Sequence, residues 1–131
     1  MNNAEKKRIL VVDDEPRIGK VLSIKLNLSG FDVITTTSGA EAIELARTQE
    51  WDLILLDMLM PDISGMDVLD SIRTFSQVPI IVFTGLPEIA QSALKRGAND
   101  CIAKPFDPDG LIGKIESVLK ASKTGKRFHE G

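Results

Sequence analysis

Acidic residues stand directly after two apolar runs in this sequence, and their spacing could support metal chemistry. Asp13 and Asp14 follow the run 9–12 (ILVV), and Asp57 follows the run 53–56 (LILL). Such runs are typical of parallel strands buried on both faces, whose carboxyl ends meet at one edge of a sheet. Three carboxylates gathered there would repel one another, and a hard divalent cation would relieve the repulsion. Because no His or Cys joins the cluster, we predict a site for Mg²⁺ or Mn²⁺ rather than for zinc.

Two more polar residues add a hydroxyl and an ammonium group to the predicted cluster. Thr84 follows the run 80–83 (IIVF), and Lys104 follows the segment 100–103. A metal and a lysine at one edge favour an anionic group between them, and phosphoryl is the natural candidate. The sequence lacks the Gly-x-x-x-x-Gly-Lys-Ser/Thr loop that cradles nucleotide phosphates. We therefore predict that a carboxylate itself accepts the phosphoryl group, with Asp57 at the end of the central strand as the nucleophile.

Alternating strands and helices are predicted to position these residues. Pro16 and Ser38 suit helix starts, and Gly30 suits a helix end. The predicted strands are 9–12, 31–35, 53–56, 80–83 and 100–103, and the predicted helices are 16–28, 38–50, 65–75, 88–96 and 107–121. With the most apolar strands in the centre and right-handed crossovers, the strand order is 2-1-3-4-5. The predicted fold class is α/β, a flavodoxin-like doubly wound five-stranded parallel sheet with helices on both faces.

The composition fits one domain of ordinary size. The chain has 131 residues and a net charge of −3, so charge does not mark it as a nucleic-acid or membrane binder. One cysteine rules out an internal disulfide, and the apolar runs are too short to cross a bilayer. We predict an N-terminal extension over 1–7, a domain over 8–121 and a basic flexible tail over 122–131. Residues 1–8 lack the apolar stretch of a secretory signal, so the expected location is the cytoplasm.

Short motifs on these elements resemble those of the bacterial response-regulator receiver domain, a module of two-component signalling. They occur in the family's order, on the expected elements, across residues 8–121. The motifs are VVDDE at 11–15, LLDM at 55–58, MP at 60–61, SG at 64–65, TG at 84–85, GA at 97–98 and KPF at 104–106. Each motif alone is weak, whereas several in register are highly specific.

The resemblance implies a metal-binding role for the acidic residues. Asp57 would be the phosphoacceptor. Asp14, Asp57 and the backbone carbonyl of Leu59 would bind Mg²⁺ directly, and Asp13 would act mostly through water. The resemblance therefore implies that the acidic cluster predicted from the residues is a phosphorylation site, with Mg²⁺ as its metal and Asp57 as its nucleophile.

The resemblance also assigns the groups that contact the phosphoryl group. Lys104 would pair with it, the Thr84 hydroxyl would move to bind it, and the backbone amides of Leu59 and Gly85 would donate hydrogen bonds to it. A cis peptide bond between Lys104 and Pro105 is implied as well. Together these groups would neutralise and orient the charge that arrives on Asp57.

Partners follow from the same resemblance. A sensor histidine kinase or a phosphotransfer protein would supply the phosphoryl group from a phosphohistidine. Phosphorylation would change the surface of the fourth helix and fifth strand, which a downstream effector or an attached output domain would read. The domain would catalyse its own phosphorylation and dephosphorylation without turning over an external substrate, and we expect it to contact neither nucleic acid nor a membrane.

Two features depart from the family pattern. Cys101 occupies the switch position where the family usually has Tyr or Phe, and a thiol cannot fill the volume of a ring. We expect Cys101 to be a small buried core residue. The segment from Thr84 to Gly97 is slightly shorter than the family norm, so we predict an altered face on the fourth helix.

Three other functions remain open at the level of sequence. The first is a pseudo-receiver that binds partners without being phosphorylated, for which Cys101 is the main argument. The second is a Mg²⁺-dependent phosphatase with Asp57 as nucleophile, although the apolar Leu59 supplies no general acid. The third is a flavin-binding protein of the same fold, although the expected hydroxyl-rich phosphate loop is missing after the first strand.

Overall fold

The structure is a computed structural model that describes residues 6–129, with side chains described through residue 122. Strands and helices alternate along the described chain. The strands are β1 (Arg8–Val12), β2 (Asp32–Thr36), β3 (Leu53–Asp57), β4 (Ile80–Thr84) and β5 (Asp100–Ala103), and the helices are α1 (Pro16–Leu28), α2 (Gly39–Thr48), α3 (Gly65–Arg73), α4 (Pro87–Lys95) and α5 (Pro108–His129). Among the helices described, none combines the length and hydrophobicity needed to cross a membrane.

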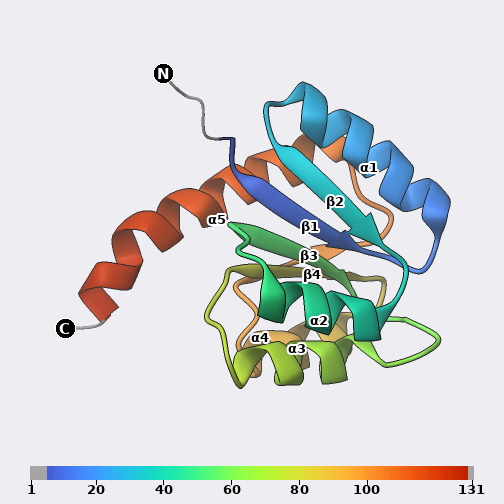
Figure 1. Cartoon of the computed structure of the whole chain (residues 1–131). Coiled ribbons are helices and arrows are strands. Elements are labelled where there is room, and N and C mark those ends of the chain that lie inside the picture. The colour runs from blue at the N-terminus through green and yellow to red at the C-terminus, as the bar shows by residue number, and fades with distance from the viewer. Residues whose placement is uncertain (1–5, 130–131) are drawn as a thin grey trace.

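The strands form one parallel sheet in the order β2-β1-β3-β4-β5, which confirms the predicted fold class (Figure 1). Helices α1 and α5 pack on one face, and α2, α3 and α4 pack on the other. Because both faces are covered, every residue of β3 and β4 is buried. The strand order reverses direction between β1 and β3, so the crevice at their carboxyl ends is the expected binding position in such a sheet.

Helix starts follow the local sequence signals. The Ser38 hydroxyl accepts a hydrogen bond from the backbone N–H of Glu41 and caps α2. Ser64 caps α3 in the same way through the N–H of Asp67. Pro16 opens α1, where its missing N–H costs no helical hydrogen bond. These caps set where each helix begins relative to the strand that precedes it.

The last helix is longer than the predicted helix over 107–121. Helix α5 continues past residue 121 to His129 (Figure 1), through residues that were predicted to form a flexible tail. The division of the chain into an N-terminal extension, a domain and a basic flexible tail stays a prediction. Lys and Arg are strong helix formers and suit the C-terminal end of a helix dipole, so a helix can continue there after its apolar stripe has ended. Residues 130–131 lie outside the described part.

Candidate functional site

Three carboxyl groups meet at the carboxyl edge of the sheet, as the sequence predicts. Asp13 directly follows β1, and Asp57 is the last residue of the neighbouring strand β3. One oxygen each from Asp13, Asp14 and Asp57 lies within 4.8 Å of the others. Asp13 and Asp57 are buried, whereas Asp14 is exposed. The cluster therefore has a buried floor and one side open to solvent.

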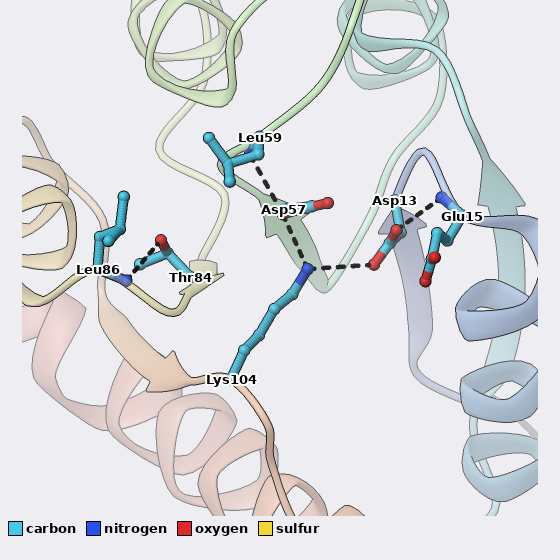
Figure 2. Close-up of polar contacts among 7 residues, drawn as sticks. All are labelled: Asp13, Glu15, Asp57, Leu59, Thr84, Leu86 and Lys104. Atoms are coloured by element: carbon cyan, nitrogen blue, oxygen red, sulfur yellow. Dashed lines mark hydrogen bonds and ion pairs between the residues drawn. The ribbon is translucent and has the colours of Figure 1, made fainter.

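Lys104, which directly follows β5, reaches across β4 into this cluster (Figure 2). Its Nζ atom lies 3.2 Å from Oδ1 of Asp57 and 4.0 Å from Oδ2 of Asp13. The backbone N–H of Leu59 donates to the same Asp57 Oδ1 atom at 3.2 Å. The phosphoacceptor predicted from sequence is thus fixed from two sides through one of its two oxygens.

A glycine allows α3 to begin directly against the end of β3. A Cβ atom at Gly65 would lie 2.5 Å from the backbone oxygen of Asp57 and 2.5 Å from Cα of Met58. The N–H of Gly65 donates to the carbonyl of Met58 at 3.1 Å. Only glycine permits this approach, which folds the loop after Asp57 back over the strand end.

Burial raises the pKa of both inner carboxyl groups. Desolvation, with the nearby charges of Asp57 and Asp14, raises the pKa of Asp13 to about 6, although the N–H of Glu15 and the charge of Lys104 oppose the shift. Desolvation also raises the pKa of Asp57, against the lowering effects of the Leu59 N–H and of Lys104. One ammonium group therefore does not compensate the buried negative charge.

The donor set fits a hard divalent cation. Oδ2 of Asp13 is buried and accepts no hydrogen bond from the described residues, and the ammonium group of Lys104 is 4.0 Å away from it. Burying a carboxylate oxygen without a hydrogen-bond partner is unfavourable for folding, and coordination to a metal ion would compensate that cost. Mg²⁺ prefers oxygen ligands from one or two carboxylates together with water. Asp13, Asp14 and Asp57 offer ligands of this kind, and the open side admits water.

Comparison with known proteins assigns the family. The model of the response regulator receiver domain matches residues 9–116, which is most of the chain. The chain belongs to the response regulator receiver domain family. The acidic cluster and the lysine of this receiver domain lie on the motifs that suggested the family from sequence.

Relatives and solved structures agree with this assignment. The receiver domain is 41% identical over 118 residues to a "probable transcriptional regulator ycf27" of Porphyra purpurea, a match covering 88% of this chain and 49% of that protein. It is 36% identical to the cell cycle transcriptional regulator CtrA of Caulobacter vibrioides, covering 88% of this chain and 52% of CtrA. This chain thus spans about half the length of these curated relatives.

Solved structures of receiver domains superpose along nearly their whole length. The CheY-like receiver domain of Methanospirillum hungatei gives a TM-score of 0.87 at 27% identity, with 92% of this chain and 99% of that chain covered. The chemotaxis protein CheY4 of Vibrio cholerae gives a TM-score of 0.81 at 31% identity, with 87% and 99% covered. The match in backbone extends over the sheet and its helices.

The remaining predicted contact residues of the receiver domain lie at the carboxyl ends of β4 and β5. Thr84 ends β4 and is buried, and its hydroxyl accepts a hydrogen bond from the N–H of Leu86 at 3.1 Å. Gly85, the next residue, is exposed. The peptide bond between Lys104 and Pro105 is cis, as the resemblance implied. The Thr84 hydroxyl is thus engaged within its own turn (Figure 2).

Cys101 differs from its prediction. The residue is half-buried rather than fully buried, because β5 is an edge strand with a neighbour on one side only. Its side chain packs at the margin of the hydrophobic cluster beneath α2, α3 and α4. The switch position therefore combines a small side chain with partial exposure, and its part in switching stays a prediction.

Two aromatic residues support the lysine, a role that the sequence did not reveal. The Nζ atom of Lys104 lies 5.0 Å from the ring centroid of Phe83. The ring of Phe106 packs edge-on against Phe83, with centroids 5.8 Å apart. A cation over an aromatic face is stabilised by the ring quadrupole. The sequence shows Phe106 only as part of the KPF motif, and nothing in the local pattern signals that Phe83 lies beneath the ammonium group.

Proposed function

We propose that this receiver domain is phosphorylated on Asp57 in a Mg²⁺-dependent reaction, with phosphoryl supplied by a histidine kinase or phosphotransfer protein. The observation that carries the proposal is a buried Asp57 carboxylate held by Lys104 and the Leu59 amide beside two further acids. A structural ion pair would need no such excess of negative charge. A site that binds a metal cation together with an anionic group needs this excess of carboxylates, because the cation neutralises them.

Asp57 is oriented for attack by its own contacts. Both Lys104 and the N–H of Leu59 engage Oδ1, which leaves Oδ2 to attack phosphorus. The bond from Oδ2 to phosphorus forms as the bond from the donor's imidazole nitrogen to phosphorus breaks. The imidazole keeps the electron pair and later takes a proton from solvent. Lys104 then pairs with a phosphoryl oxygen, since its Nζ already lies beside the nucleophile.

Asp13, Asp14 and Asp57 would hold the Mg²⁺ ion, with the Leu59 carbonyl as a further ligand. Bound Mg²⁺ would neutralise negative charge on the transferring phosphoryl group and on the acidic cluster. The contribution of the chain is to keep these oxygens together. Mn²⁺ has the same ligand preferences and could replace Mg²⁺.

Thr84 would carry the signal from the site to the surface. The acyl phosphate brings about −1.5 to −2 of charge by analogy with other phosphorylated residues. Capturing that charge would require the Thr84 hydroxyl, which accepts the N–H of Leu86, to turn its O–H toward the phosphoryl group, while the Gly85 amide donates a hydrogen bond to the same group. The segment from Thr84 into α4 would then rearrange and change the surface of α4 and β5, with Cys101 in place of a gating ring.

The output would lie outside this domain. Relatives described as transcriptional regulators are about twice as long as this chain, which supports an attached output domain or a separate effector as the reader. We place the protein in the cytoplasm and assign no external turnover substrate to it. Direct nucleic-acid or membrane contact by this domain is not part of the proposal, because its net charge is −3.

The test is phosphoryl uptake from a small donor. Wild-type protein incubated with acetyl phosphate and Mg²⁺ should gain the mass of one phosphoryl group, and EDTA should prevent the gain. The Asp57→Asn variant should gain none. Asp67→Asn, which removes an exposed acid in the first turn of α3, is the matched control and should react like the wild type. Absence of uptake by folded wild-type protein, with beryllofluoride also failing to bind, would favour the pseudo-receiver interpretation.

A further inference from the structure

The loop between β3 and α3 carries the backbone that contacts Asp57, yet the contacting residue is not itself anchored by burial. Leu59 donates its N–H to Oδ1 of Asp57, while its side chain is 58% exposed. Something else must therefore hold this part of the loop in place. The beginning of the loop is fixed by β3, and its end is fixed where Gly65 starts α3.

Asp62, in the same loop, bridges to a different element. Its carboxylate accepts a hydrogen bond from the Ser38 hydroxyl at 3.1 Å and from the backbone N–H groups of Gly39 and Ala40 at 3.2 Å each. These donors form the N-terminus of α2. A carboxylate is favoured there by both the unpaired N–H groups and the helix dipole, and the same contacts lower the pKa of Asp62.

Packing beside this bridge holds the two segments in contact. A Cβ atom at Gly39 would overlap the side chain of Ile63 and lie 3.0 Å from Cγ2 of Val68. Glycine at this position lets α2 approach the loop closely enough for the Asp62 carboxylate to reach its N–H groups. The bridge is thus part of a tight interface between α2 and the loop that ends at α3.

The N-terminus of α2, which Asp62 contacts, is itself connected to the acidic cluster. The N–H of Ser38 donates to the Thr36 hydroxyl at 3.2 Å, and the carbonyl of Thr36 accepts the N–H of Asp13 at 3.1 Å. A series of contacts therefore runs from Asp57 through the loop to Asp62, on to the start of α2, and from there to the backbone of Asp13. The series ends on the carboxylate of Asp57 at one side and on the backbone N–H of Asp13 at the other.

We propose that Asp62 is a positioning residue, which by joining the loop after β3 to the N-terminus of α2 holds the Leu59 backbone in place for metal and phosphoryl binding. The inference rests on the proposed function for its chemical consequence. Its structural part, the placement of the Leu59 N–H against Asp57, can be tested without metal or phosphoryl donor. Asp62 itself touches neither reacting atom.

Hydrogen exchange and metal binding test this role together. In Asp62→Ala, the Leu59 N–H should exchange several-fold faster than in the wild type when no divalent cation is present. Mg²⁺ affinity should fall about tenfold, as is typical when a group that orients metal ligands is removed. Asp62→Asn keeps one acceptor oxygen for the α2 N–H groups and should show a smaller loss. Asp67→Ala, a matched loss of an acid from the neighbouring helix start, should change neither measurement.

Stability and wild-type activity separate the outcomes. Urea unfolding shows whether each variant is folded under the conditions of the exchange and binding measurements. Reduced stability with unchanged Leu59 exchange and unchanged Mg²⁺ affinity would mean that Asp62 only caps α2, and would overturn the inference. Failure of the wild type itself to bind Mg²⁺ or take up phosphoryl would instead overturn the proposed function. Faster Leu59 exchange in Asp62→Ala would support the structural part in either case.

Discussion

Charged side chains differ in their pairing between the amino ends of the strands (the amino edge of the sheet) and the carboxyl ends (the carboxyl edge). At the amino edge, Arg8 is surrounded by partners: its guanidinium donates to the carbonyl of Glu50 and the side chain of Gln49. The same guanidinium lies 4.3 Å from the ring centroid of Trp51. The backbone N–H of Arg8 donates to the Asp52 carboxylate at 2.7 Å. The charges of Arg8 and Asp52 are thus paired with groups that satisfy them.

At the carboxyl edge, the charges outnumber their partners. Asp13, Asp14 and Asp57 face one ammonium group, that of Lys104, and one buried oxygen of Asp13 accepts no hydrogen bond within the described chain. Burial first, and the neighbouring acids second, raise the pKa values of Asp13 and Asp57. The comparison shows that charge pairing at the amino edge stabilises the fold. The carboxyl edge instead holds carboxylates whose mutual repulsion destabilises the fold, and a cation would relieve that repulsion.

The backbone approach at Gly65 should give the largest effect on stability. Gly65→Ala places a Cβ atom against backbone atoms of Asp57 and Met58 that cannot move aside cheaply. We expect the free energy of unfolding to fall by about 3 kcal/mol, as for severe overpacking. Urea denaturation measures the change. Gly113→Ala is the matched control, because its Cβ would meet nothing within 4 Å and alanine favours the helix. Equal stability of the two variants would contradict the close approach.

Removing one acid from the crowded edge should stabilise the protein. Ionised Asp13 opposes folding because its pKa lies at about 6 rather than 3.8, a difference worth at most ~3 kcal/mol. Asp13→Asn also loses the attraction to Lys104, so we expect a net gain of about 1–2 kcal/mol at neutral pH without divalent cations. Urea unfolding in the presence of EDTA measures this gain.

The pH dependence of that gain follows from the sign of the pKa shift. The folded state binds the proton of Asp13 more tightly than the unfolded state does, so its unfavourable contribution is complete above about pH 6 and disappears as the pH falls to 3.8. The advantage of Asp13→Asn should shrink across this window. If Asp13→Asn were less stable than the wild type at neutral pH, ionised Asp13 would not oppose folding, and the contrast between the edges would fail.

The same substitution at the amino edge should act in the opposite direction, with the smallest effect. Asp52→Asn weakens the hydrogen bond from the backbone N–H of Arg8, which now meets a carboxylate. We expect a loss of about 0.5–1 kcal/mol, in the range of a single charge-assisted hydrogen bond replaced by a neutral one. Urea unfolding of the two Asp→Asn variants side by side provides the comparison. Stabilisation by Asp52→Asn would remove the contrast between the edges.

Much of the site could be predicted because its residues follow apolar strands. The runs before Asp13, Asp57 and Thr84 identify buried parallel strands, and parallel strands end at a common edge. The supporting contacts could not be predicted in this way. Phe83 beneath Lys104 and Asp62 against the start of α2 depend on which side chains meet across elements. The length of α5 could not be predicted either, because the helix continues beyond residue 121 after its apolar stripe has ended.

The sequence by itself determined the alternation of strands and helices, the strand order and the acids at the carboxyl edge, since periodicity and burial are written locally along the chain. Tertiary structure alone decided that Lys104 contacts Asp57 across 47 residues of sequence and that Asp62 joins Gly39 across 23. It also decided which oxygen of Asp13 accepts no hydrogen bond from the part of the chain that the structure describes. The physical reason is that desolvation and charge pairing depend on distances between side chains in space, which no local pattern specifies.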